Sequence, residues 1–215
     1  MSCEELALRM TDCGIDDPSS RGEAARIIER ARAGDRAAFE SIVVEHQRRV
    51  LMTALHMLGS TEDAEDVTQE VFLRLYRYLH RFDPSRSLTP WLYRMTVNVC
   101  RDFARKRGRA HASASGLAGS DDSVRRTDAD LEMADQKRLV TQALEALTQK
   151  ERAAIVLRDI EGLPTSEVAR ILGSTETTVR SQISAARVKI KKFVEQISGY
   201  APRPPEGSSP KGGAS

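Results

Sequence analysis

The chain has 215 residues, of which 40% are hydrophobic, 30% are charged and 5% are aromatic. This length suits one or two domains of ordinary size. No apolar run approaches the roughly 20 residues of a membrane-spanning helix. The acidic start, MSCEELALRM, lacks the basic and then apolar pattern of a secretory signal. We therefore expect a cytoplasmic protein with no direct membrane insertion.

The net charge of +2 conceals separated patches of charge along the chain. Residues 61–70 contain five acids and no base, whereas residues 101–109 contain five bases and one acid. A second basic stretch, residues 187–192, has four bases and no acid. Local patches decide charged partners more than the total charge does, so we expect partners of both signs.

The cysteines and histidines give no sign of a metal site or of catalysis. Cys3, Cys13 and Cys100 lack CxxC spacing and are odd in number, which argues against a zinc site or a disulfide framework. A redox role for Cys3 and Cys13 stays open, although free thiols are favoured, and Cys100 is expected to pack on a helix. The four histidines lack metal-ligand spacing, and no Walker motif or nucleophile elbow occurs. We expect no catalytic residue, no metal, no cofactor and no small-molecule substrate, so the chain is not expected to be an enzyme.

Residues 1–20 are polar and acidic and are expected to form a disordered tail, whereas the first domain, residues 21–109, is helical throughout. Gly34-Asp35 separates a short helix from a long one that ends near Gly59. Ser60 or Thr61 then caps a helix whose first turns are crowded with acids, as the helix dipole favours.

The loop RFDPSRSL leads into the next predicted helix, which runs through WLYRMTVNVCRDFARKRGR. Thr89 is expected to cap this helix and Pro90 to take its first position, where a missing N–H costs nothing. Residues 110–130 are rich in Gly, Ala, Ser and Asp and predict a flexible linker.

Residues 131–198 predict a second helical domain, followed by a disordered Pro/Gly/Ser tail at 199–215. Thr148 and Glu151 form a capping box that opens a helix ending by Gly162. The chain as a whole is predicted to be all-α, with two small domains joined by the linker.

The second domain contains a predicted helix-turn-helix, LPTSEVARILGSTETTVRSQISAARVKIKKFV. Thr165 is expected to cap the first helix, Gly173 to end it and Thr175 to cap the second. Apolar residues of the second helix recur at spacings of four, three and four: Val179, Ile183, Ala186 and Ile190. The opposite face offers hydrogen-bonding side chains suited to base edges and phosphates: Thr177, Thr178, Arg180, Ser181, Gln182, Ser184 and Arg187.

Four segments occur in the order typical of one family: ERARAGDRAAFE, DAEDVTQEVF, WLYRMTVN and TTVRSQISAAR. Together they resemble the extracytoplasmic-function (ECF) sigma factors of bacterial RNA polymerase, over most of residues 21–109 and 131–194. The resemblance implies a first domain that binds core polymerase and melted −10 DNA, and a helix-turn-helix domain that reads duplex −35 DNA. The β′ and β subunits of core RNA polymerase and promoter DNA are therefore the expected partners.

The resemblance also assigns roles to residues of the first domain. The acidic helix is expected to dock on a basic coiled coil of β′ through Asp63, Asp66, Gln69 and Glu70. Without the resemblance, a solvated acidic first turn would be the preferred interpretation. The helix after the loop is expected to read the −10 element through Phe82, Arg94, Asn98, Arg101 and Arg105. Asn98 matches an asparagine that helps recognise an extruded base, whereas Trp91 is expected to pack in the core.

The chain departs from the family pattern in its helix-turn-helix and in the loop before the −10 helix. Gln182 replaces a frequent arginine, Ser184 and Ala185 replace an aromatic-basic pair, and Glu176 adds an acid. Fewer cations neutralise fewer phosphates, so we expect weaker and less salt-sensitive −35 binding than in a typical member. Gln182 is suited to adenine, whereas arginine prefers guanine. Pro84 and Pro90 stiffen the loop, which leaves the −10 base preference open.

Two alternative functions remain open at the level of sequence. A stand-alone helix-turn-helix regulator would explain the second domain but not the acidic helix or the −10-like helix. A sigma mimic that titrates an anti-sigma factor would have no need of Asn98 or the basic helix end, both of which are present. The resemblance further implies control by an anti-sigma factor, often held at the membrane.

Overall fold

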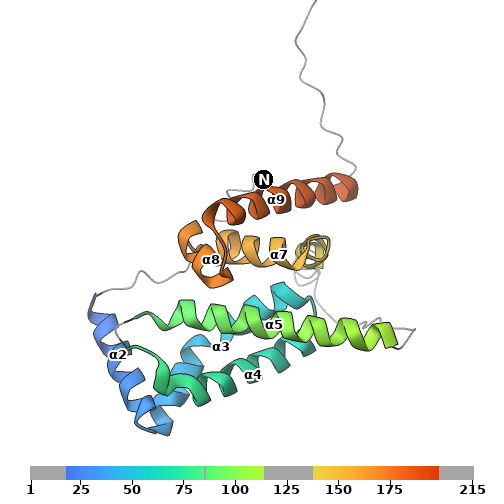
Figure 1. Cartoon of the computed structure of the whole chain (residues 1–215). Coiled ribbons are helices and arrows are strands. Elements are labelled where there is room, and N and C mark those ends of the chain that lie inside the picture. The colour runs from blue at the N-terminus through green and yellow to red at the C-terminus, as the bar shows by residue number, and fades with distance from the viewer. Residues whose placement is uncertain (1–17, 85, 114–137, 199–215) are drawn as a thin grey trace, which may run out of the picture.

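The computed structural model describes residues 18–84, 86–113 and 138–198 (Figure 1). In these residues the regular secondary structure is helical, which confirms the predicted all-α class. The predicted tails and most of the predicted linker lie outside them. The described elements are α2 (Pro18–Arg32), α3 (Arg36–Leu58), α4 (Thr61–Tyr78), the 3₁₀ turn η1 (Leu79–Arg81), α5 (Leu88–Ser113), a helix over 138–145, α7 (Gln149–Ile155), the π-helical η2 (Val156–Ile160), α8 (Thr165–Leu172) and α9 (Glu176–Ser198).

Local signals in the sequence set several of the helix ends. The Ser60 hydroxyl accepts the Asp63 N–H at 3.2 Å and caps α4. Thr148 and Glu151 form the predicted capping box of α7. Gly59 and Gly173 end α3 and α8 with φ of 77° and 62°, in the left-handed region that glycine adopts at least cost.

Two predicted caps are wrong, and α2 and α5 extend beyond their predicted ends. Pro164 is the N-cap of α8, so Thr165 is already helical and makes no cap. α5 begins at Leu88, which places Thr89 and Pro90 inside its first turn. The Thr89 hydroxyl instead accepts the Arg49 guanidinium at 3.4 Å, so a contact from α3 occupies the predicted cap. α2 begins at Pro18 and α5 continues to Ser113, a few residues beyond the predicted domain limits.

The first half of the chain packs α3, α4 and α5 around one core, with α2 and η1 at one end (Figure 1). Val50, Val67, Leu75 and Val97 from these three helices are almost completely buried. Cys100 lies in the same core, where burial raises the pKa of its thiol to about 12. This thiol stays protonated at neutral pH, in agreement with the packing role expected from the sequence.

The second half packs α7 and η2 between α9 on one side and α3 of the first half on the other, while α8 packs against α5. Five consecutive residues, 153–157, are buried. Ala153, Ala154 and Leu157 belong to the cluster that contains the core of the first half, whereas Ile155 and Val156 pack with Ala186 of α9. A helix that is apolar all round needs neighbours on every side, and here α3 of the first half supplies one of them.

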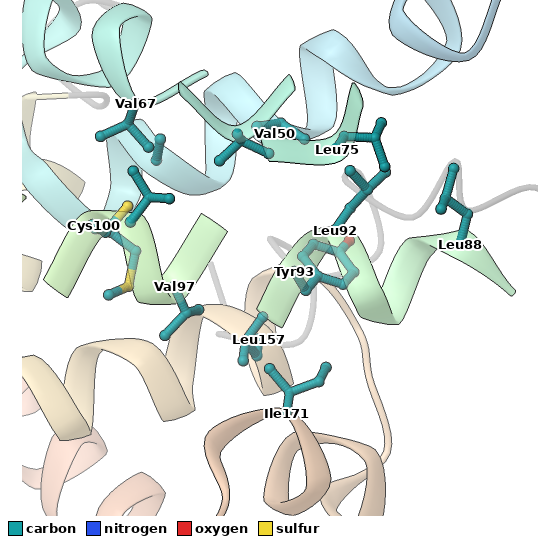
Figure 2. Close-up of a cluster of buried hydrophobic side chains, with 14 of the residues drawn as sticks. Val50, Val67, Leu75, Leu88, Leu92, Tyr93, Val97, Cys100, Leu157 and Ile171 are labelled. Atoms are coloured by element: carbon teal, nitrogen blue, oxygen red, sulfur yellow. The ribbon is translucent and has the colours of Figure 1, made fainter. Parts of the chain in front are cut away.

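Helix α5 therefore lies between two layers. Figure 2 shows Val50, Val67 and Leu75 on one side of it, and Leu157 and Ile171 on the other, next to Tyr93 and Val97. The two predicted domains thus share one hydrophobic core in this conformation, whereas two separate domains were predicted from the sequence. No helix in the described segments has the length and apolarity needed to cross a membrane.

Candidate functional site

The acidic helix α4 exposes part of its predicted polymerase-binding face. Asp66 and Gln69 are exposed, while the apolar face with Val67 and Val71 is fully buried. Glu70 is half-buried and accepts the Arg74 guanidinium at 2.7 Å, one turn further along the helix. The carboxylates therefore stand on a rigid helix whose orientation is fixed by the core.

Asp63 is less free than the other acids of this face. Its carboxylate pairs with the guanidinium of Arg107, near the end of α5. This pair joins the start of the acidic helix to the basic end of the −10 helix. The two predicted sites are thus neighbours in space.

The predicted −10 residues of α5 lie along one face of that helix. Arg94, Asn98, Arg101 and Arg105 recur at spacings of four, three and four, which keeps them on one side. Arg94, Asn98 and Arg105 are exposed, and Arg101 is half-buried. Burial, together with neighbouring Arg105, lowers the pKa of the Arg101 guanidinium, which stays charged near neutral pH because its ordinary pKa is so high.

Arg105 is also held within α5. Its guanidinium pairs with Asp102, whose carboxylate lies 3.7 Å from Arg74 of α4. The face therefore combines cations for phosphates with the amide of Asn98, which can donate to and accept from a base.

Phe82 is placed differently from an exposed base-contacting residue. It is buried, and its ring stacks on Trp91 with centroids 5.1 Å apart. Trp91 is half-buried against the core, as expected from the sequence. Both aromatic residues line a cleft of about 640 Å³, together with Arg94 and with residues of α8. Phe82 therefore forms the wall of this cleft through packing.

The predicted −35 face of α9 is largely exposed. Val179, Ile183 and Ala186 are buried on the opposite face, which confirms the predicted apolar face of this helix. Thr177, Ser181 and Ser184 project to solvent, as does Arg180, which pairs with Glu176 at 2.7 Å. The Thr175 hydroxyl accepts the Thr178 N–H at 3.2 Å, which confirms Thr175 as the cap of the helix.

Two further residues of the predicted −35 set, Gln182 and Arg187, differ in their exposure. Gln182 is half-buried, and its amide oxygen is buried without a hydrogen-bond partner among the described residues. Arg187 makes two hydrogen bonds to the Asp159 carboxylate of η2, at 2.8 and 2.9 Å. Gln182 is therefore less accessible than its neighbours on α9, whereas Arg187 is exposed but held by Asp159.

A polar contact between the two halves was missed by the sequence reasoning. The Glu161 carboxylate accepts the Thr53 hydroxyl of α3 at 2.8 Å and the Tyr93 hydroxyl of α5 at 2.6 Å. Arg152 of α7 donates to the Met57 carbonyl of α3 at 2.8 Å. One signal for Glu161 was present: a carboxylate directly after a helix C-terminus is disfavoured by the dipole and calls for a donor elsewhere.

Comparison with protein families finds two matches, in chain order. Residues 42–110 match the family described as Sigma-70 region 2, and residues 137–190 match the family described as Sigma-70, region 4. The first match contains α4 and α5, and the second contains the helix-turn-helix. A stand-alone regulator would leave the first match unexplained.

Several curated relatives align with this chain over most of their length. The ECF RNA polymerase sigma factor SigE of Mycolicibacterium smegmatis is 34% identical over 88% of this chain and 75% of the relative. The ECF RNA polymerase sigma-E factor of Escherichia coli is 31% identical, and the RNA polymerase sigma-H factor of Pseudomonas aeruginosa is 29% identical. Each of these two matches covers 80% of this chain and 94% of the relative.

Two solved structures have a similar fold. CnrH, solved in complex with the cytosolic domain of CnrY, aligns with a TM-score of 0.61 and 27% identity over 80% of this chain and 97% of CnrH. RpoE of Bartonella quintana, solved with the anti-sigma factor NepR, aligns with a TM-score of 0.61 and 22% identity over 73% of this chain and 96% of RpoE. The chain belongs to the ECF sigma factors, which bind core RNA polymerase and direct it to promoter DNA for transcription initiation.

Proposed function

We propose that this sigma factor divides its task among three helix faces: α4 docks on polymerase, α5 reads the melted −10 element and α9 reads the duplex −35 element. The observation that carries the proposal is the position of the family-matched residues. Most of them are exposed on helices whose opposite faces are buried, so the core holds each helix in place while it presents these side chains.

Asp66, Gln69 and Glu70 are proposed to contact the basic coiled coil of β′, with Asp63 at the border of this surface. Complementary charge there speeds and orients docking more than it tightens the complex. Asp66→Arg is therefore expected to reduce the rate of association with core polymerase at low salt by tenfold or more. Glu29→Lys reverses the same charge on the exposed face of α2 and serves as the control.

Arg94, Arg101 and Arg105 are proposed to follow the phosphates of the melted strand, and Asn98 to contact an extruded base. Phe82 is proposed to form one wall of the pocket for that base without contacting it, because its ring is buried and stacked on Trp91. Asn98→Ala is expected to remove preference at one −10 position, whereas Arg105→Ala is expected to weaken binding to all sequences alike.

On α9, we propose that Thr177, Arg180, Ser181 and Ser184 face the major groove, with Thr178, Gln182 and Arg187 at its borders. The weak salt dependence expected from the sequence is supported by Arg180 and Arg187, since both already pair with carboxylates of the chain. Gln182→Arg is expected to shift one −35 position towards guanine. An unchanged promoter preference in this variant would remove Gln182 from the set of base readers.

Anti-sigma control is proposed as the regulation of this chain. It is supported by the family and by CnrH, a 27% identical protein that was solved bound to the cytosolic domain of a second protein. We further propose a location in the bacterial cytoplasm, where core polymerase is found, with a partner that holds the factor at the membrane. Polymerase supplies the chemistry, and the sigma factor catalyses no reaction of its own.

Run-off transcription on a genomic promoter library tests the proposal directly. Core polymerase is assayed with and without the purified full-length chain, and the start sites are sequenced. New start sites with shared upstream elements are expected only when the chain is present. Stable core binding without new transcripts would contradict the proposal and favour a mimic. Absence of both core binding and new transcripts would contradict the proposal and favour the stand-alone regulator.

A further inference from the structure

The −10 helix and the helix-turn-helix are in direct contact, although they serve separate promoter elements. Helix α8 packs on α5, and Ile171 of α8 is buried in the shared core. The names of the two elements place them about 25 base pairs apart, or about 85 Å at about 3.4 Å per base pair. Helix α5 itself, with 26 residues, spans only about 39 Å. A molecule in this conformation cannot contact both elements.

The same contact obstructs the −10 surface. The cleft beside Phe82 and Trp91 is lined on its other side by Glu167, Arg170 and Ile171 of α8, which narrow the access to Arg94. Glu167 and Arg170 form an ion pair there. A DNA strand entering along Arg94 would meet the α8 backbone and the carboxylate of Glu167. Promoter binding therefore requires α8 to leave.

The hydrogen bonds of Thr53 and Tyr93 to Glu161 hold the two halves together and can be broken when the halves separate. Thr53 is fully buried and Tyr93 is almost so, and both hydroxyls lie within hydrogen-bond distance of one carboxylate. The single proton of the Thr53 hydroxyl is shared with the Arg49 carbonyl, also at 2.8 Å. Hydrogen bonds to a charged group are stronger than neutral ones, and together these two join both α3 and α5 to the end of η2. On separation, water can replace both hydroxyls, so the contact breaks without leaving a buried charge.

We propose that Glu161, Thr53 and Tyr93 form an interdomain latch that keeps the free sigma factor closed and its −10 surface blocked until polymerase separates the two halves. This inference rests on the proposed function of α5 and α8–α9. It assigns a positioning role to three residues that touch neither DNA nor polymerase. Weakening the latch raises the fraction of open molecules, and the apparent affinity for polymerase rises with that fraction.

The first test measures the distance between the halves in the full-length protein without DNA or polymerase. Spin labels are attached at Glu65→Cys on α4 and Lys192→Cys on α9, both exposed positions, in a Cys3→Ser/Cys13→Ser background. Buried Cys100 stays unlabelled. The closed wild-type protein is expected to give one narrow distance distribution, and Thr53→Val/Tyr93→Phe is expected to add a population at longer distances. A broad wild-type distribution, or an unchanged one in the double variant, would overturn the latch.

Matched substitutions control for general loss of structure. Thr96 is also buried, but its hydroxyl bonds only to Leu92 within α5, and Tyr76 is exposed on α4. Thr96→Val/Tyr76→Phe therefore removes the same two kinds of hydroxyl group away from the interface and is expected to keep the wild-type distance. Tyr93→Phe alone retains the ring and serves if the double variant loses helical circular dichroism.

The second test measures the sigma concentration that gives half-maximal run-off transcription with core polymerase. It is expected to fall by up to about a hundredfold in Thr53→Val/Tyr93→Phe, because each of the two lost bonds to a charged group shifts the closed-to-open ratio by about tenfold. An unchanged or higher concentration in the folded variant would contradict the latch. If no variant supports transcription, the proposed function fails, while the distance measurement still decides whether the latch exists.

Discussion

At the scale of single residues, burial of ionisable groups sets how the protein responds to pH. His46 and His56 of α3 are both mostly buried, and each has an Nδ1 atom without a hydrogen-bond partner among the described residues. Burial lowers the pKa of both imidazoles, and for His56 the nearby Glu161 carboxylate partly offsets this effect. Both side chains are therefore neutral in the folded protein near pH 7.

Stability is expected to decrease as the pH falls below about 6.5, the ordinary histidine pKa. Between the folded and unfolded pKa values the unfolded chain binds more protons, so acid favours unfolding. The free energy of unfolding, measured by urea denaturation between pH 7 and 5, is expected to fall by up to about 1.4 kcal/mol per pH unit for each histidine. His56→Gln is expected to flatten this slope, whereas His80→Gln, at an exposed position, leaves it unchanged. Equal slopes in the two variants would show that His56 is not a source of the effect.

At the scale of helices, one ion pair connects the first turn of α7 to α9. The Glu151 carboxylate closes the capping box with Thr148 and also accepts Lys189 of α9 at 2.8 and 2.9 Å. The lysine and the backbone N–H of Thr148 are the main causes that lower the pKa of Glu151. One side chain therefore fixes both the first turn of α7 and its position against α9.

Thr148→Ala is expected to lower the free energy of unfolding by about 1 kcal/mol, because the helix loses a side-chain acceptor for the Glu151 N–H. Chemical denaturation followed by circular dichroism measures the difference. Thr61→Ala, at an exposed first-turn position of α4, is expected to change stability by less than about 0.5 kcal/mol. A loss of similar size in both variants would mean that the cap contributes nothing specific.

Helix α9 carries a second prediction, on the salt dependence of promoter binding. Asp159→Asn removes the charge that pairs with Arg187 and leaves at most one of these two acceptors, so the guanidinium becomes more available to a phosphate. We expect the reconstituted holoenzyme to bind promoter DNA more tightly, with a slope of log K against log salt that is steeper by about 0.9. Glu195→Gln alters the Lys191 pair further along α9 and is the control. An identical slope in Asp159→Asn would place Arg187 away from the DNA.

These helices also show which features a sequence can reveal. Caps such as Ser60 and Thr175 were predictable because the hydroxyl and the N–H that it accepts are three residues apart. The predicted cap at Thr89 was wrong, because the Thr89 hydroxyl accepts a hydrogen bond from Arg49, which lies 40 residues earlier in the chain. The π-helical turn at Val156–Ile160 has no sequence signature of its own. The exposed faces of α4, α5 and α9 followed from spacing, but the burial of Phe82 and the pairing of Asp63 depend on distant neighbours.

At the scale of the whole molecule, the two matched regions form one body in this conformation. Leu157 of η2 is fully buried in the cluster that also holds the core of α3, α4 and α5. The run AAIVL at residues 153–157 carried a hint of this arrangement, because a small helical domain alone rarely covers a helix on all sides. Two separate domains on a flexible linker were predicted from the sequence, and this shared core was not.

Leu157→Ala is expected to destabilise the protein by about 2–5 kcal/mol, as truncations of buried leucines do. The effect should reach the first half of the chain. Hydrogen exchange measured by mass spectrometry is expected to speed up in α3 and α5 as well as in α7. Ile190→Ala, a truncation in the second cluster, should affect α7 and α9 but spare α3 and α5. Unchanged exchange of α5 in Leu157→Ala would mean that the two halves do not share a core in solution.

The stacking of Trp91 on Phe82 has a further consequence, because Trp91 is the only tryptophan in the chain. Its indole lines the cleft with Ile171 and Arg170, so its surroundings change from protein to water when α8 departs. The molecule thus contains a built-in optical probe. A red shift of intrinsic fluorescence on mixing with core polymerase, which a stopped-flow instrument can follow without any dye, would time the opening of the sigma factor in its native sequence.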